Sequence, residues 1–242
     1  MEGIRMDDIR IQKEITAAKD WFYQETELWL NYIDKQDRTA FQNDGMWNDV
    51  LHVMIYAFKM YGHSQERTVR MAGLLCLLRC SGHLHELVQD GMAGVDKKVQ
   101  FRLLVGDQIM ARAVELLAED EAYELIPYFA GIVVKMSEGM VKYLGKKQIV
   151  ADILSYTHAP WYEAAFYSAA CLAHQSEQQA MNAAKLGFQF GMFWEAKREQ
   201  IVLEAGVKNA GMDWSVLPDG WEKDTLIQMM EQSLADLEED KG

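Results

Sequence analysis

Proline occurs only three times in the 242 residues, at Pro127, Pro160 and Pro218. Inside a helix, proline removes a backbone hydrogen bond and clashes with the preceding turn, so the long intervals between these residues are free to form helices. The helix-favouring residues Ala, Leu, Met, Glu, Lys and Gln are abundant in those intervals, and strict apolar–polar alternation is rare. The sequence therefore predicts an all-α protein.

The spacing of apolar residues predicts a series of helices. The expected ranges are 9–34, 47–61, 65–88, 99–119, 121–143, 146–156, 161–174, 176–205 and 224–239. Ser64 is the expected N-cap of the third range, although Arg67 stands where a capping box would have Glu. No Gly/Ser/Pro linker or internal repeat divides the chain, so we expect a single domain over residues 1–242.

Charge and cysteine content limit the function classes. The chain has 24 basic and 37 acidic residues, a net charge of −13, which argues against nucleic acid as a partner because such binding needs a basic surface. Three cysteines do not form a disulfide framework and suit a reducing compartment. The charged N-terminus is unlike a signal peptide, and the longest apolar run, 126–134, is too short to cross a bilayer. We therefore expect a cytoplasmic protein with no transmembrane segment, with a lipid ligand left open.

The segment LLVGDQIMARA, residues 103–113, resembles the "VLVGDYLLARA" helix start of the trans-isoprenyl diphosphate synthases, the head-to-tail prenyltransferases. Other segments resemble further parts of that family in the same order: 45–61, 70–90, 136–140, 162–171 and 186–198. The resemblance implies an isoprenoid-synthase-like helical bundle around a central cavity. Because the chain stops soon after the place of the family's "GK.TLP", near residues 223–227, the last helices of the family are expected to be lacking.

The first acidic motif of the family, DDxxD, binds magnesium and diphosphate, and its five positions here read Glu86, Leu87, Val88, Gln89 and Asp90. Only the first and last acids remain. Hard cations prefer several oxygen ligands, so two carboxylates are a remnant of the motif rather than a full magnesium cluster. A solvated helix end in an acidic protein is the simpler interpretation of the same residues. A transition-metal site that adds His83 and His85 is the less favoured interpretation, because such spacings often arise by chance.

The second DDxxD is altered further, since its positions read Trp194, Glu195, Ala196, Lys197 and Arg198. Glu195 is the single remaining acid, and two cations stand where a magnesium ion would bind. The resemblance also implies two replaced diphosphate contacts. Met46 and Trp47, or Trp47 and Asn48, occupy the place of a Lys-Arg pair, and Tyr162 and Glu163 that of a Lys-Thr pair.

Cys76 and Cys80 form a CxxxC on one helical face, similar to the partner-binding motifs of small plant synthase subunits. Two buried hydrophobes in a helix core explain the pair equally simply, and we prefer that explanation.

Metal ions and cationic side chains stabilise the diphosphate as it leaves the substrate, and most of their positions are replaced here. We therefore assign no catalytic residue and no metal ion to this chain. We expect a non-catalytic small subunit of a heteromeric trans-polyprenyl diphosphate synthase, which stabilises a catalytic partner that binds Mg²⁺ and influences product chain length. The resemblance places the partner interface on the two helices around the VGD segment. The interface residues expected there are Asp107, Met110, Ala111, Val114, Met136 and Met140.

Two alternatives from other classes stay open. One is a stand-alone protein, monomeric or paired with itself, that binds a prenyl diphosphate or another lipid in the old cavity. The other is a weakly active, magnesium-dependent prenyltransferase built on Glu86, Asp90 and Glu195.

Overall fold

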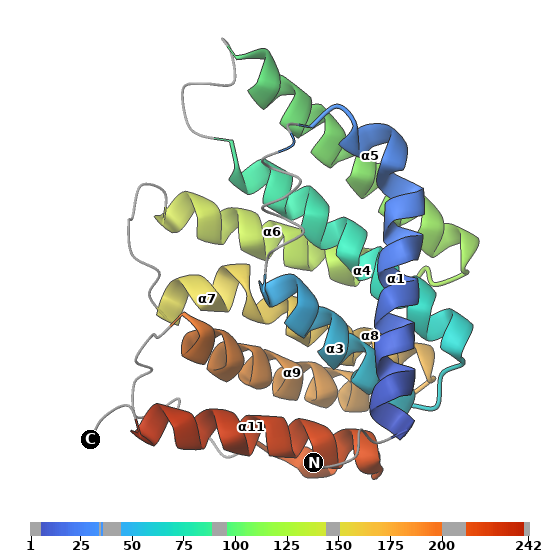
Figure 1. Ribbon diagram of the computed structural model, residues 1–242, viewed down its shortest axis with the longest axis vertical. Helices are drawn as coiled ribbons and strands as arrows, with labels where there is room; N and C mark the ends of the chain where they lie inside the picture. Colours follow the sequence, from blue (N-terminus) through green and yellow to red (C-terminus); the bar gives the residue numbers. More distant parts are fainter. Residues whose placement is uncertain are drawn as a thin grey trace. The chain divides into compact units, whose positions relative to one another are not determined.

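The computed structural model describes residues 6–33, 35, 45–88, 96–143, 151–199 and 212–239 (Figure 1). Within these ranges the secondary structure is helical and no strand occurs. The helices are α1 (Met6–Leu30), α3 (Gly45–Met60), α4 (Gln65–Glu86), α5 (Lys97–Glu119), α6 (Leu125–Tyr143), α7 (Ala151–Thr157), α8 (Ala159–Leu172), α9 (Glu177–Arg198), the short 3-10 helix η1 (Trp214–Val216) and α11 (Trp221–Glu239). The predicted all-α class is confirmed.

The chain divides into two compact units. Unit 1 comprises residues 1–55 and 64–126, and unit 2 comprises residues 56–63 and 127–242. Helix α3 begins in unit 1 and ends in unit 2. The single domain expected over residues 1–242 stays a prediction, as do the central cavity and the lack of the family's last helices.

Unit 1 is built on α4, which packs against α1 and α5. Ser64 caps α4 by accepting a hydrogen bond from the backbone N–H of Arg67, as the sequence predicts. Gly73 allows a close approach of α1, because a methyl group there would overlap the indole ring of Trp21. Ion pairs secure the contacts with α5: Arg70 of α4 binds Asp120, and Arg112 of α5 binds Glu25 of α1 at 2.9 Å.

Unit 2 is centred on the antiparallel pair of α8 and α9, which lie side by side (Figure 1). A full capping box starts α9: the Ser176 hydroxyl accepts from the backbone of Gln179, and the Gln179 side chain accepts from the backbone of Ser176. Two glycines bring the helices close together. A Cβ at Gly187 would lie 2.6 Å from the Tyr162 carbonyl oxygen, and one at Gly191 would lie 2.6 Å from the Tyr162 ring.

The remaining elements of unit 2 cover this pair. Gly139 of α6 admits the Tyr156 side chain of α7. The end of α3 is tied to α8 by a hydrogen bond of 2.8 Å between His63 Nε2 and the carbonyl oxygen of Ala169. Helix α11 packs on α9, and its Trp221 meets Tyr56 edge to face at 5.7 Å.

Predicted and observed helix ends mostly differ by a few residues. Helix α11 begins three residues before the predicted start, and α1 ends at Leu30 rather than at residue 34. Glu121 adopts a left-handed φ of 56° and separates α5 from α6, so α6 starts at Leu125, four residues after the predicted position. The predicted ends of α7 and α9 that fall at 146–150 and 200–205 lie outside the described residues. In the described part, no helix is both long and apolar enough to cross a membrane.

Candidate functional site

Glu86, where the first acidic motif is expected to begin, is the last residue of α4. Oε2 of Glu86 lies 3.4 Å from Nη1 of the buried Arg79 and 3.8 Å from Nδ1 of His83. The carboxylate therefore faces a cation of its own helix, seven residues earlier in the chain. Asp90, the other acid of the remnant, lies outside the described residues.

The VGD segment of α5 packs directly on the end of α4. The hydroxyl of Ser81 donates to the carbonyl oxygen of Gly106 at 2.8 Å, and a Cβ at Gly106 would lie 2.9 Å from His85 Nε2. The same His85 nitrogen lies 3.3 Å from Oδ1 of Asp107. Gly106 thus leaves room for the His85 ring, and Asp107 pairs with α4 while most of its side chain stays exposed.

Glu195, the acid expected to remain from the second motif, lies in a hydrogen-bonded network of unit 2. Glu195 is fully buried, and Arg198 donates to its Oε2 from Nε at 2.9 Å and from Nη2 at 2.6 Å. The Tyr162 hydroxyl donates to the other oxygen, Oε1. Both carboxylate oxygens are therefore engaged by side chains, and the positive charge that compensates Glu195 comes from Arg198.

Aromatic rings fill the space beside this network. Trp194 stacks on Phe190 with ring centroids 5.7 Å apart, and Trp214 meets Phe190 edge to face at 6.4 Å. The first position of the second motif, which is an acid in the synthase family, therefore contributes to ring packing in this chain.

Glu163, the second residue at the place of the family's Lys-Thr pair, binds α6. It accepts hydrogen bonds from the Tyr128 hydroxyl at 3.2 Å and from Lys135 Nζ at 3.3 Å. Burial raises the pKa of Tyr128, and the nearby Glu163 carboxylate raises it further. Lys135 also lies over the ring of Phe188, 4.4 Å from its centroid. These contacts secure α6 against α8 and α9.

The structure gives no support to a metal site in the described ranges, where no three His, Cys, Asp or Glu residues are grouped to hold an ion. Of the residues considered for a transition metal, His83 pairs with Glu86 and His85 with Asp107. Each of these two histidines therefore has its own carboxylate.

The expected partner residues on α5 and α6 differ in exposure. Ala111 and Val114 are exposed on α5, and Met110 is half-buried. Met136 is only 5% exposed, so it packs inside the chain and offers little surface to a partner. The Met140 side chain lies outside the described residues.

Cys76 and Cys80 are both buried in α4. Burial raises the pKa of the Cys80 thiol to about 12, and it raises the pKa of Cys76 well above its ordinary value. Both positions behave as the small core hydrophobes that the preferred interpretation of the CxxxC predicts.

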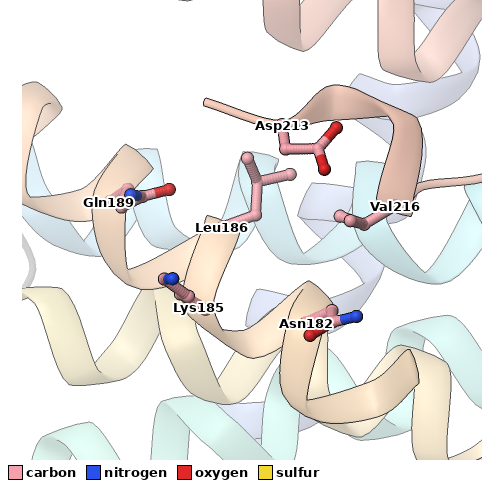
Figure 2. A pocket seen from close by; sticks show the side chains of 6 residues that line it. All are labelled: Asn182, Lys185, Leu186, Gln189, Asp213 and Val216. Atoms are coloured by element: carbon pink, nitrogen blue, oxygen red, sulfur yellow. The ribbon is translucent and has the colours of Figure 1, made fainter. Parts of the chain in front are cut away.

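A pocket of about 180 Å³ lies between α9 and the segment around η1 (Figure 2). Leu186 and Val216 are its apolar residues, and polar side chains make up the rest of its lining: Asn182, Lys185, Gln189 and Asp213. Asp213 is occupied as the N-cap of η1, where hydrogen bonds from Ser215 lower the pKa of its carboxyl group. The pocket lacks the apolar walls that a prenyl chain needs.

No known family profile matches the sequence, and no curated protein matches it. Several solved structures nevertheless share its fold. A geranylgeranyl pyrophosphate synthase from Corynebacterium glutamicum, solved with calcium and isoprenyl diphosphate, is 11% identical with a TM-score of 0.74, over 97% of this chain and 98% of that one.

Two further structures show the same likeness. A deletion mutant of the heterotetrameric geranyl pyrophosphate synthase from mint is 12% identical with a TM-score of 0.62, over 91% of this chain and 98% of that one. A decaprenyl diphosphate synthase from Rhodobacter capsulatus is 14% identical with a TM-score of 0.61, and the match covers 78% of this chain but only 63% of the synthase. The chain therefore has the fold of the trans-prenyl diphosphate synthases, and the resemblance noted in its sequence is confirmed at the level of the fold.

Sequence reasoning found Glu86 and Glu195 but missed most of their partners. Arg198 lies three residues after Glu195, a spacing that allows an ion pair on one helix, so that contact had a signal in the sequence. Tyr162 is separated from Glu195 by 33 residues and Arg79 from Glu86 by seven. Neither separation identifies a pair without the fold.

Proposed function

We propose that this chain is a non-catalytic subunit of a heteromeric trans-polyprenyl diphosphate synthase, which stabilises a catalytic subunit and influences the length of its product. The observation that carries the proposal is the engagement of both Glu195 oxygens by Arg198 and Tyr162. A magnesium ligand must offer a free lone pair toward the ion. In this chain a guanidinium group binds one oxygen of the Glu195 carboxylate and a phenol donates to the other, so the negative charge that would attract a cation is already compensated.

Glu195 is still an acid, and its hydrogen bonds within the protein distinguish this chain from one in which the acid is simply lost. A buried carboxylate left without a partner is costly, yet Glu195 is fully buried and compensated within unit 2. The surroundings of the motif therefore favour a stable folded chain without a bound ion. This supports a role that depends on the fold rather than on metal chemistry.

The surface of α5 supports a role in assembly. Leu104, Ala111 and Val114 are exposed there, and their spacing of seven and three residues places them along one face of the helix. Exposed apolar residues that line up on one face mark an interaction site, whereas scattered ones do not.

The surface of α6 has the same character. Small or apolar residues are exposed on it at positions three or four apart, Ala130, Gly131, Val134, Ser137 and Val141, together with the charged Glu138 and Lys142. The small residues of this face permit close packing of another helix. The fold neighbours include a heterotetrameric geranyl pyrophosphate synthase, which gives this proposal a precedent of the same fold.

We place the complex in the cytoplasm, where Cys76, Cys80 and Cys171, none of which forms a disulfide with a described residue, would remain reduced. The magnesium ions would belong to the catalytic subunit, which would retain both DDxxD motifs. The small, mostly polar pocket between α9 and η1 does not itself offer a site for the alternative of a stand-alone lipid-binding protein.

The test is co-purification with the DDxxD-bearing prenyl synthase of the same organism, followed by light scattering. We expect a stable complex with the wild-type chain and a weaker one with Val114→Glu, which puts an unpaired charge on the α5 face. Met181→Glu, on an equally exposed apolar residue of α9, should bind as the wild type does. Failure of the wild-type chain to bind the synthase would contradict the proposal.

A further inference from the structure

Two aromatic rings of unit 1 stack on each other at the surface. Tyr32, just after α1, and Phe101, near the start of α5, have ring centroids 6.3 Å apart and planes only 8° from parallel. Tyr32 is nevertheless 67% exposed and Phe101 is 45% exposed. The stack therefore holds both rings in place while leaving much of their apolar area in water.

Two leucines extend this surface on the same helices. Leu28 is 76% exposed and lies four residues before Tyr32, and Leu104 is 63% exposed and lies three residues after Phe101. The spacing on α5 makes Phe101 and Leu104 neighbours on one helix face, and Leu28 lies in the last turn of α1, shortly before Tyr32. We call these four residues, Leu28, Tyr32, Phe101 and Leu104, the α1–α5 patch.

The size of the patch matters for a stable complex. A stable protein interface covers about 800 Å² on each partner, and the exposed α5 residues Ala111 and Val114 are too small to supply much of that area. The patch adds two aromatic rings and two leucines, and it joins the α5 face through Leu104. Aromatic side chains are also the residue type that most often dominates binding energy.

Charges beside the patch limit what can cover it. The exposed Lys97 and Lys98 stand at the start of α5, whereas Glu115 and Glu119 near its end are ion-paired with Arg112 of the same helix. A partner surface that is acidic opposite the two lysines fits this distribution of charge. A second copy of this chain would bring another net charge of −13, and repulsion between such copies opposes self-association.

We infer that the α1–α5 patch anchors the catalytic synthase subunit, and that the surface of that subunit opposite the start of α5 carries acidic residues against Lys97 and Lys98. The inference rests on the proposed function and adds the end of α1 to the contact surface. Leu28 and Tyr32 then bind the partner directly, whereas the sequence places the contact on the helices around the VGD segment alone.

The experiment measures the affinity of the synthase for the wild-type chain, for Leu28→Ser/Tyr32→Ser and for Ile9→Ser by titration calorimetry. Ile9 is the matched control, because it is 47% exposed at the opposite end of α1. We expect the double variant to bind at least about tenfold more weakly and Ile9→Ser to bind as the wild type does. Circular dichroism melting checks that both variants fold, which their exposed positions favour.

The outcomes separate the two proposals. If the wild-type chain binds the synthase and the double variant binds as tightly as Ile9→Ser, the patch is not the anchor, and the proposed function stands. If the wild-type chain does not bind the synthase, both proposals fail. Sedimentation showing a homodimer that the double variant abolishes would assign the patch to a second copy. Wild-type binding to anionic phospholipid vesicles that the double variant abolishes would assign it to a membrane, and either result overturns the inference.

Discussion

Arg198 and Glu195 lie one turn apart on α9 and form a buried ion pair in which Nη2 of the arginine is 2.6 Å from Oε2 of the carboxylate. Tyr162 of α8 donates to the remaining oxygen. The network joins the two central helices of unit 2 through a carboxylate that is fully buried. Glu195 therefore contributes to the packing of α8 on α9.

Removing the cation of this pair should destabilise the protein strongly. In Arg198→Met the fully buried Glu195 keeps its charge without a compensating cation, and the free energy of unfolding should fall by about 3 kcal/mol. Urea unfolding followed by circular dichroism measures the change.

The double variant Arg198→Met/Glu195→Gln is the control. It removes both charges, so its loss of stability should be clearly smaller than that of Arg198→Met alone. Equal losses for the single and double variants would show that the ion pair is not what stabilises this part of α9.

Replacing either of two helix glycines by alanine should change the stability of the protein, in opposite directions for the two positions. In Gly73→Ala the new methyl group overlaps the Trp21 ring, and the resulting strain should cost about 1–3 kcal/mol. A Cβ at Gly131 would have no neighbouring atom within 4 Å, so Gly131→Ala should stabilise by up to about 1 kcal/mol through helix propensity. Thermal melting compares the variants, and a stabilising Gly73→Ala would contradict the close packing of α1 on α4.

Stability should fall as the pH rises above 9, partly because of the buried thiols. Burial raises the pKa of Cys80 from 9.0 to about 12 in the folded protein. Between these values the unfolded chain loses the thiol proton and the folded chain keeps it, so the unfolded state is favoured as the pH rises. Below pH 9 the contribution is fully present. Cys76 is shifted in the same direction.

Urea midpoints at pH 8 and pH 11 test this for the wild type and for Cys76→Ala/Cys80→Ala. The double variant should lose less stability between the two pH values. Burial also raises the pKa of Tyr61 to about 12. Tyr61 is present in both proteins, so its effect on stability cancels when the wild type and the double variant are compared. An equally steep decline in both would mean that the thiols are accessible to solvent in the folded protein.

Local features of this protein could be predicted from sequence, and tertiary ones could not. Ser64 caps α4 as expected because an N-cap depends on residues within one turn. The assignment of Glu86 and Glu195 to remnant acidic motifs stays a prediction, because it depends on the resemblance and not on a contact in the structure. The stack of Tyr32 on Phe101, in contrast, joins residues 69 positions apart, and only the packing of α1 on α5 brings them together. Met136 was expected at the interface from its helix alone, whereas its burial depends on neighbours that the helix pattern does not specify.

The most direct test of the central claim is a prenyl-transfer assay with magnesium, isopentenyl diphosphate and an allylic primer. The chain is assayed alone, the DDxxD-bearing synthase of the same organism is assayed alone, and the two are assayed together. Our account predicts no product from this chain alone and a changed yield or chain length in the mixture. Magnesium-dependent product from this chain alone would contradict it, as would a mixture that behaves as the synthase does by itself.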